Sequence, residues 1–206
     1  MGAVLSLDAL LEDRRVWRGQ PGAAPDKAPQ PTGHAVLDAA LPQGGWPDPG
    51  LSEVLAPLDG MGELALVWPT LARMTAAGER VALVAPPYRP NAPAWFSAGL
   101  DLRRLYIIEA TPRNALWAAE QCLRSGACKA VLCWPQRADD RALRRLAVAA
   151  ETGQALGIAF RPLREAANPS PAALRLQLEG RATVRVLKCR GSHPPRQAFA
   201  LADHRH

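Results

Sequence analysis

The chain is 206 residues long, with 48% hydrophobic and 21% charged residues, which is the composition of one soluble globular domain with a sizeable core. No apolar run is long enough to span a membrane, and the acidic N-terminal stretch lacks the basic start and apolar core of a secretory signal. The net charge of +6 fits nucleic acid or an acidic partner and equally fits a coding bias toward arginine, so charge alone does not decide the function.

The N-terminal stretch predicts a helical arm on a linker. Residues 4–18 have helical periodicity, interrupted by Arg14, and residues 19–32 are dense in proline, glycine and alanine, as in an extended or flexible linker. The body is expected to begin near Pro31. The apolar face of the arm consists of Leu7, Leu10, Leu11 and Trp17. This face either docks on a partner or folds back on its own domain.

From Leu51 onward, predicted strands alternate with predicted helices. The strands are expected at 51–56, 81–85, 105–108, 130–133 and 157–161, and the helices at 62–77, 92–98, 111–125 and from Asp139 and Asp140 onward, the last with Leu143, Leu146, Ala147 and Ala150 facing inward. Thr111 and Pro112 form a helix-start signal, a capping hydroxyl followed by proline. Such alternation favours parallel strands covered by helices on both faces.

The last part of the chain has a different pattern. Two alternating segments, 173–178 and 183–189, are joined around Gly180 and Arg181, which indicates an antiparallel hairpin. The predicted fold class is therefore α/β, a mixed sheet with a parallel centre and a C-terminal antiparallel hairpin, flanked by helices. The expected organisation is an arm and linker over 1–30, a core over 31–191 and a basic tail over 192–206.

The four cysteines predict thiols and no metal site. They have no C-x-x-C spacing and no histidine at ligand spacing, so small buried or partly buried thiols in a reducing cytoplasm are expected. They are Cys122, Cys128, Cys133 and Cys189.

Several short signals between residues 31 and 57 occur in an order that resembles the start of the ATPase core of RecA-type recombinases. They are Pro31-Thr32-Gly33-His34, Val36-Leu37-Asp38, Leu41-Pro42, Gly44-Gly45, Gly50, and a strand carrying Glu53. The order of elements that follows matches as well, up to the final hairpin. This resemblance covers about residues 31–190 and implies a RecA-like core.

The resemblance places a phosphate-binding loop after the first strand, and the required residues are missing there. A working loop needs glycines, a lysine for the phosphates and a hydroxyl for magnesium at the start of a helix. After Asp59 and Gly60, aligning Gly62 with the last loop glycine puts Glu63 at the lysine position and Leu64 at the hydroxyl position. A carboxylate about 4 Å from a phosphate costs on the order of 4 kcal/mol at an effective dielectric constant near 20.

Two further positions lack the chemistry that the resemblance implies. The strand 130–133 runs into Trp134, where RecA-like enzymes carry a metal-linked aspartate, and the strand 81–85 runs into Pro86 and Pro87, where a catalytic glutamate is expected. Pro87 can neither orient a water molecule nor accept a proton. We therefore expect no enzymatic activity, no nucleotide or other cofactor, and no metal.

Two bacterial families resemble RecA cores without the ATPase machinery, the ImuA family and the shorter SulA-type inhibitors of cell division. This chain is more similar to ImuA. The similarity rests on Trp17-Arg18-Gly19 after the arm, the proline-rich linker, Phe160-Arg161-Pro162, Pro169-Ser170-Pro171-Ala172, Leu174-Arg175-Leu176 and the segment from Val186 to Gly191. It implies a cytoplasmic, non-catalytic adaptor in SOS-induced translesion DNA synthesis that binds ImuB and RecA, and indirectly an error-prone DnaE-type polymerase. The alternatives are a SulA-like inhibitor that binds FtsZ and an active ATPase with a rearranged loop.

Two surfaces are candidates for partner contact. The arm, with the apolar residues named above, offers buried anchors of the kind that dominate interfaces, and it could also join two copies of the chain. The C-terminal edge carries Arg185, Lys188 and Arg190, with Arg181, Arg196 and Arg205 nearby and little acidic compensation expected. This edge either contacts DNA phosphate or an acidic partner or is a solvated edge strand kept from stray pairing by its charge. Direct DNA contact is expected to be weak or indirect.

The remaining candidates have a structural interpretation. Trp68, Trp95 and Trp134 could form a recognition surface, but core packing is the expectation. His34 has no base–nucleophile constellation around it, so no chemistry is assigned to it.

Overall fold

The computed structural model describes residues 30–60, 62–135, 137–180 and 182–201. These residues form an eight-stranded sheet in the order β3-β2-β4-β5-β1-β6-β7-β8. The strands are β1 (Gly50–Ala56), β2 (Val81–Val84), β3 (Leu105–Ile108), β4 (Ala130–Cys133), β5 (Leu156–Pro162), β6 (Leu174–Leu178), β7 (Thr183–Cys189) and β8 (Ala198–Ala200). The strands from β3 to β6 in this order are parallel, and β7 and β8 are antiparallel to their neighbours.

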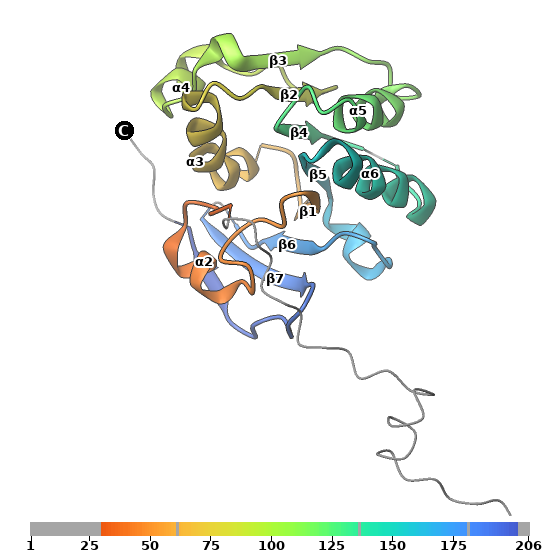
Figure 1. Cartoon of the computed structure of the whole chain (residues 1–206). Helices are drawn as coiled ribbons and strands as arrows, with labels where there is room; N and C mark the ends of the chain where they lie inside the picture. Colours follow the sequence, from red (N-terminus) through yellow and green to blue (C-terminus); the bar gives the residue numbers. More distant parts are fainter. Residues whose placement is uncertain (1–29, 61, 136, 181, 202–206) are drawn as a thin grey trace, which may run out of the picture.

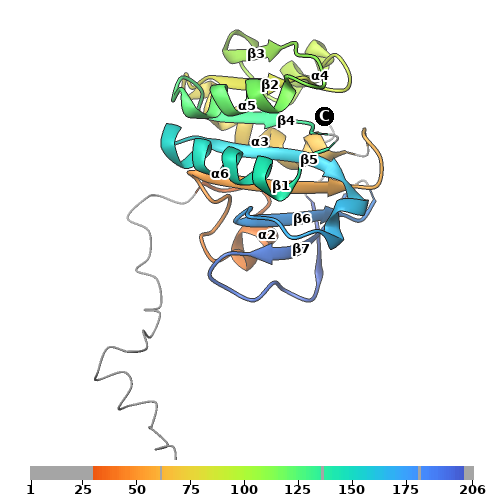
Figure 2. The same ribbon diagram turned by 90° about the vertical axis from the view of Figure 1, so that its right-hand side faces the viewer.

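Helices cover both faces of the sheet, as Figures 1 and 2 show. The helices are α2 (Ala35–Ala40), α3 (Glu63–Ala76), α4 (Ala92–Ser97), α5 (Ala115–Arg124) and α6 (Asp140–Gly153), with short 3-10 turns η1 (Leu102–Arg104) and η2 (Leu163–Ala167). One face packs against α2, α3 and α4, and the other against α5 and α6. This arrangement explains why β2 and β4 are apolar at every position, because both faces of a central parallel strand are buried.

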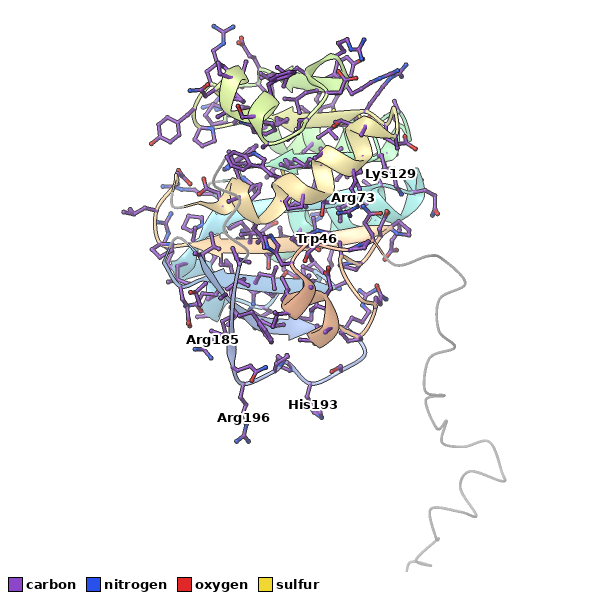
Figure 3. The ribbon with its side chains drawn as sticks, turned by 90° about the vertical axis from the view of Figure 1, so that its left-hand side faces the viewer. Trp46, Arg73, Lys129, Arg185, His193 and Arg196 are labelled. Atoms are coloured by element: carbon purple, nitrogen blue, oxygen red, sulfur yellow. The ribbon has the colours of Figure 1, made fainter. Side chains whose placement is uncertain are left out.

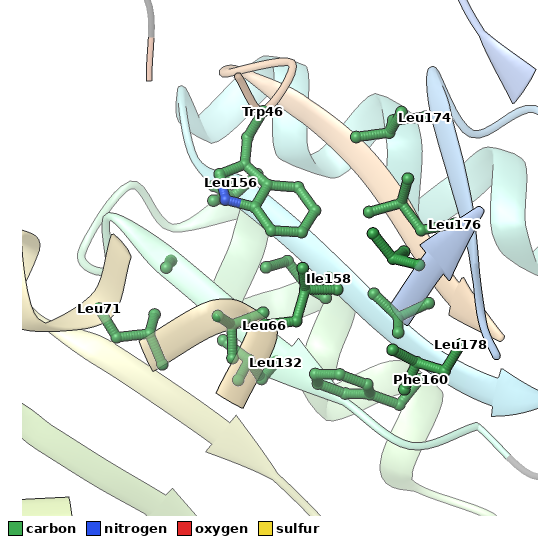
Figure 4. Packing of buried hydrophobic residues seen from close by; sticks show 14 of the residues in the cluster. Trp46, Leu66, Leu71, Leu132, Leu156, Ile158, Phe160, Leu174, Leu176 and Leu178 are labelled. Atoms are coloured by element: carbon green, nitrogen blue, oxygen red, sulfur yellow. The ribbon is translucent and has the colours of Figure 1, made fainter. Parts of the chain in front are cut away.

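Trp46 anchors the segment that leads into β1. It is 1% exposed and packs among apolar side chains of the larger core, including Leu156 and Ile158 of β5 (Figure 4). Its indole Nε1 donates a hydrogen bond to Thr70 Oγ1 at 2.9 Å, and that hydroxyl lies 3.0 Å from the Pro31 carbonyl oxygen. Hydrogen bonds through the Thr70 hydroxyl therefore link both Trp46 and Pro31, at the beginning of the core, to α3.

A buried cluster of charges joins three neighbouring strands. Glu53 on β1 is fully buried, and its two carboxylate oxygens accept hydrogen bonds from Arg161 Nη1 on β5 and from Arg175 Nε on β6, each at 2.6 Å. Arg175 also donates to the Glu165 carbonyl oxygen at 2.9 Å, and Arg161 donates to Glu165 Oε2 at 2.9 Å and to the Ala138 carbonyl oxygen at 2.8 Å. The turn η2 thus covers an ion cluster that has almost no contact with water.

The predicted fold class, an α/β domain with a parallel centre and a C-terminal antiparallel hairpin, is confirmed. The predicted strands agree with those observed to within one residue at each end. The expectation for one helix was wrong at its start, because residues 112–114 form a turn and α5 begins at Ala115, four residues later than predicted. On α6, Ala149 is fully buried while Ala147, expected to face inward, is only partly buried.

Two elements, α2 and β8, are additions to the predicted set. The strand β8 pairs with β7 and lies within 192–206, the stretch expected to be a basic tail. The predicted arm lies outside the described residues.

Candidate functional site

The loop that the sequence resemblance compares with a phosphate-binding loop contains a hydrogen bond from its main chain to one of its own side chains. Between β1 and α3, Glu63 is 5% exposed, and its Oε1 accepts a hydrogen bond from the Gly60 N–H at 2.8 Å. Gly62, the residue that precedes the helix, has a left-handed φ of 97°. An anion at a helix N-terminus is favoured by the free N–H groups and the helix dipole. Glu63 lies in the first turn of α3, so its carboxylate places a negative charge near that end of the helix while it bonds to the loop.

The other loop residues add no ligand for a metal or a phosphate. Leu64 is partly buried against the larger core, so its side chain serves packing. Asp59 and Gly60 are exposed, and a Cβ at Gly60, where φ is 81°, would meet no atom within 4 Å. The second oxygen of Glu63 has no hydrogen-bond partner among the described residues. A nucleotide phosphate would have to displace or approach a buried carboxylate, which is costly.

Trp134 occupies volume at the carboxyl end of β4. It is 6% exposed and stacks on Phe160 of β5, with ring centroids 4.9 Å apart and an interplanar angle of 19°. Trp95 is 2% exposed and contacts Trp68 edge to face at 6.4 Å. The expectation that these tryptophans pack in the core is confirmed for Trp95 and Trp134, and Trp68 is partly buried against the same core.

A cavity of about 990 Å³ opens where β2, β3 and β4 end. In open α/β sheets, ligands bind beyond the carboxyl ends of the parallel strands. Pro87 and Trp134, the two positions at which the resemblance led us to expect catalytic or metal-linked residues, both line it. Much of the remaining lining is apolar. It includes Ala85, Pro86, Ile107, Ala110, Pro112, Ala115, Leu116 and Pro135.

Three arginines from three different loops surround this cavity, and sequence reasoning missed them. Arg89 follows β2, Arg113 follows β3 and Arg137 follows β4. All three arginines are exposed, and none forms an ion pair with a described residue. Glu109 is the one acidic residue among those that line the cavity. The sequence shows only that each arginine follows the end of a predicted strand. The three loops lie together because of the strand order in the sheet, which the sequence pattern does not give.

The basic C-terminal surface has more acidic compensation than expected. Arg185 forms an ion pair with Glu179 and donates to the Arg196 carbonyl oxygen at 2.7 Å. Figure 3 labels Arg185 and Arg196 on this surface. The hydrogen bond from Arg185 lowers the pKa of Glu179. The expectation that Arg185 lacks an acidic neighbour was wrong, because the hairpin turn brings Glu179 next to it. Strand β7 is also covered by β8 and is not the edge of the sheet.

Two other predicted basic residues, Lys188 and Arg190, have partners as well. Lys188 Nζ donates to the Ser170 carbonyl oxygen at 2.7 Å, and burial followed by the nearby Arg190 and Arg175 lowers the pKa of Lys188. Arg190 lies 3.9 Å from Glu151. Lys188 is therefore committed to the fold and is less available to a phosphate than its charge suggests.

The remaining predicted residues are those of the arm, two arginines, His34 and the four cysteines. Six of them lie outside the described residues, namely Leu7, Leu10, Leu11, Trp17, Arg181 and Arg205. His34 is buried, and its Nε2 lies 3.2 Å from the Leu66 carbonyl oxygen. Cys133 and Cys189 are buried while Cys122 and Cys128 are partly exposed, and burial raises the pKa of the Cys133 thiol to about 12.

No cluster of three or more His, Cys, Asp or Glu side chains that could hold a metal ion is present within residues 30–60, 62–135, 137–180 and 182–201. Among the same residues, no helix is long and apolar enough to cross a membrane.

Comparisons with known proteins give a partial similarity to a solved structure. No family model matches the chain, and no curated protein matches it. Among solved structures, the chain is similar to SulA from Pseudomonas aeruginosa, with 27% sequence identity over 54% of this chain and 97% of that chain, and a TM-score of 0.46. The similarity covers about half of the chain, and the fold class rests on the sheet topology described above.

Proposed function

We propose that the protein is a non-catalytic adaptor in SOS-induced, error-prone translesion DNA synthesis, which binds ImuB and RecA and reaches the error-prone DnaE-type polymerase indirectly. It would act in the cytoplasm, at the nucleoid during DNA damage. The observation that carries the non-catalytic part is the Glu63 carboxylate at the N-terminus of α3, bonded to the Gly60 N–H at 2.8 Å. A loop that supplies its own anion has little use for a nucleotide phosphate.

The cavity beside the lost catalytic positions supports a role in binding. An apolar lining ringed by Arg89, Arg113 and Arg137 suits a protein segment that presents an apolar side chain next to carboxylates, since interfaces combine an apolar centre with charged groups that select the partner. Single-stranded nucleic acid is less well suited, because bases need an open aromatic face and the Trp134 ring is packed against Phe160.

Capture of purified ImuB and RecA by the full-length protein tests the proposal. Three variants should separate the surfaces. Arg113→Glu with Arg137→Glu reverses charge at the cavity, Leu10→Ser with Leu11→Ser removes apolar groups from the arm, and Arg80→Glu reverses an exposed arginine at the opposite, amino end of β2 as a control. We expect the wild type and the Arg80 control to capture at least one partner and the cavity or arm variant to lose it.

Three results would contradict the proposal. Failure of the wild type to bind either partner would remove the adaptor assignment, and capture of FtsZ in the same assay would favour a division inhibitor. ATP turnover that disappears on changing Glu63 or Asp59 would instead favour an active ATPase.

A further inference from the structure

A second cavity adjoins the cavity at the ends of β2, β3 and β4. Its volume is about 820 Å³, and it lies where the chain passes from β4 into α6. Both cavities are lined by Leu116 of α5 and by Arg137 of the loop after β4. Since they meet at these two side chains, they form one groove, which begins at the loops after β3 and β2 and ends at the first turns of α6.

Four arginines along this groove have no acidic partner among the described residues. Arg89, Arg113 and Arg137 line the first cavity, and Arg141 of α6 joins Arg137 in the second. All four are exposed, and none forms an ion pair with a described residue. A guanidinium binds a carboxylate through two parallel N–H donors. The groove therefore favours an occupant that carries anionic groups at more than one point.

The acidic side chains in the groove leave this positive charge in place. Asp139 Oδ1 accepts a hydrogen bond from the Ala142 N–H at 2.7 Å and so caps its own helix. Glu165 Oε2 accepts a bond from Arg161 at 2.9 Å and belongs to the buried ion cluster. Glu109 is the third acid in the described lining, against five arginines. The net charge of the lining is therefore positive.

The surface between the arginines is apolar, which points to a protein segment as the occupant. Ile107 is 45% exposed, and Leu116 is partly buried. An apolar side chain of a partner would remove these groups from water, whereas a sugar–phosphate chain has no such group to offer. Bases need an open aromatic face, and Trp134, the one aromatic residue in the described lining, is stacked on Phe160.

We propose that the groove binds an extended segment of the partner protein in which two acidic side chains flank an apolar one. One carboxylate pairs with Arg137 and Arg141, the other pairs with Arg113, and the apolar side chain lies on Leu116. This inference rests on the proposed function, because it gives the chemistry of the partner segment that the cavity receives.

The strand order sets the distance between the two carboxylates. Arg113 follows β3 and Arg137 follows β4, and β2 lies between these strands. Neighbouring strands are about 4.8 Å apart, so the two loops leave the sheet about 10 Å from each other. A polyproline II segment rises about 9 Å in each turn of three residues, which puts side chains about three positions apart on one face. The two acids of the segment therefore stand about three residues apart.

Fluorescence anisotropy of the full chain with labelled peptides tests the proposal. Each peptide carries two glutamates with a leucine between them, in a background of serine and glycine, and the spacing of the glutamates varies through the set. We expect saturable binding that is tightest where the glutamates are about three residues apart. Replacing the glutamates with glutamine, or the leucine with serine, should weaken binding about tenfold, because charge and apolar contact are both required.

Three variants locate the bound peptide. Arg137→Gln changes the arginine that both cavities share, and Arg141→Gln changes one that lines only the second cavity. Each should weaken binding of the tightest peptide about threefold or more, since each removes a contact to a carboxylate. Arg80→Gln is the matched control, because Arg80 is also exposed but lies at the opposite, amino end of β2. It should leave binding unchanged.

The proposal is overturned if no peptide of the set binds, if the glutamine version binds equally well, or if the two groove variants bind like the wild type. Displacement of the peptide by single-stranded oligodeoxythymidine that requires the same arginines would also overturn it, in favour of nucleic acid. Peptide binding without capture of ImuB or RecA would refute the adaptor assignment and support the groove. Capture without peptide binding would do the reverse, so the two failures are distinguishable.

Discussion

Replacing Glu53 with glutamine tests how much the buried ion cluster contributes to stability. Glutamine keeps the shape of the side chain but removes its charge. The carboxylate oxygens now lie 2.6 Å from Arg161 and from Arg175, and all three side chains are at least nine-tenths buried. An amide can accept a bond at one oxygen, so its NH₂ group would face a guanidinium, donor against donor. Among the described residues, Arg161 would keep one carboxylate partner, that of Glu165, and Arg175 would keep only main-chain carbonyl partners.

The expected loss is large compared with the stability of a domain of this size. Removing one partner of a buried ion pair costs about 3–5 kcal/mol, while domains have roughly 5–15 kcal/mol in total. With a urea dependence of about 2 kcal/mol per molar, the midpoint of urea unfolding should fall by about 1.5–2.5 M. Urea unfolding followed by circular dichroism measures this shift directly.

A surface ion pair provides the control. Glu179→Gln removes the carboxylate that pairs with Arg185, but both side chains are about one-third exposed, so water and salt screen the charge and the midpoint should barely move. If Glu53→Gln shifts the midpoint no more than Glu179→Gln does, the buried charges do not stabilise the fold and the reasoning is wrong. A combined Glu53→Leu, Arg161→Met, Arg175→Met variant should recover most of the loss, since apolar replacements of buried ion clusters are often neutral.

Three further predictions concern other buried groups. Burial raises the pKa of Cys133 to about 12, so a thiol reagent at pH 8 should label it only after unfolding. The contribution of this shift to the free energy of unfolding is present below pH 9 and is lost as the pH rises toward 12. Labelling of the folded protein at pH 8 would contradict the prediction. Gly153→Ala should lower the melting temperature despite the better helix propensity of alanine, because the new Cβ would lie 1.8 Å from the Leu123 carbonyl oxygen; an unchanged melting temperature would show that α5 and α6 can separate. Trp46→Phe removes the donor to Thr70 at 2.9 Å and should cost about 1–3 kcal/mol in urea unfolding, whereas a neutral effect would mean that the hydroxyl finds another donor.

The strands could be predicted because their chemistry is local. Segments such as Val81–Val84 and Ala130–Cys133 are short apolar runs between turn residues, and that pattern does not depend on the rest of the fold. The start of α5 was harder, because Thr111 does accept main-chain bonds from Asn114 and Ala115, yet the regular helix begins only after this turn. The short strand β8 has little pattern of its own and is stabilised by pairing with β7.

The candidate site could be predicted only in part, because it depends on distance in space. Alignment placed Glu63 at the lysine position, but that its carboxylate bonds to Gly60 follows from the path of the loop. Arg113 and Arg137 looked like ordinary loop residues, because their proximity requires β2 to lie between β3 and β4. The pair of Arg185 with Glu179 depends on the hairpin register, which composition does not specify.

The position of β1 in the sheet has a consequence for how the chain folds during synthesis. β1 is made early, but its neighbours β5 and β6 begin only at Leu156 and Leu174. Strands β2, β3 and β4 can pair with one another while β1 still has both edges free. Such pairing over long sequence separation is slow, and unpaired edges are prone to aggregation. Until about residue 178 has left the ribosome, β1 therefore lacks a full set of neighbours and Glu53 lacks one or both of its arginines.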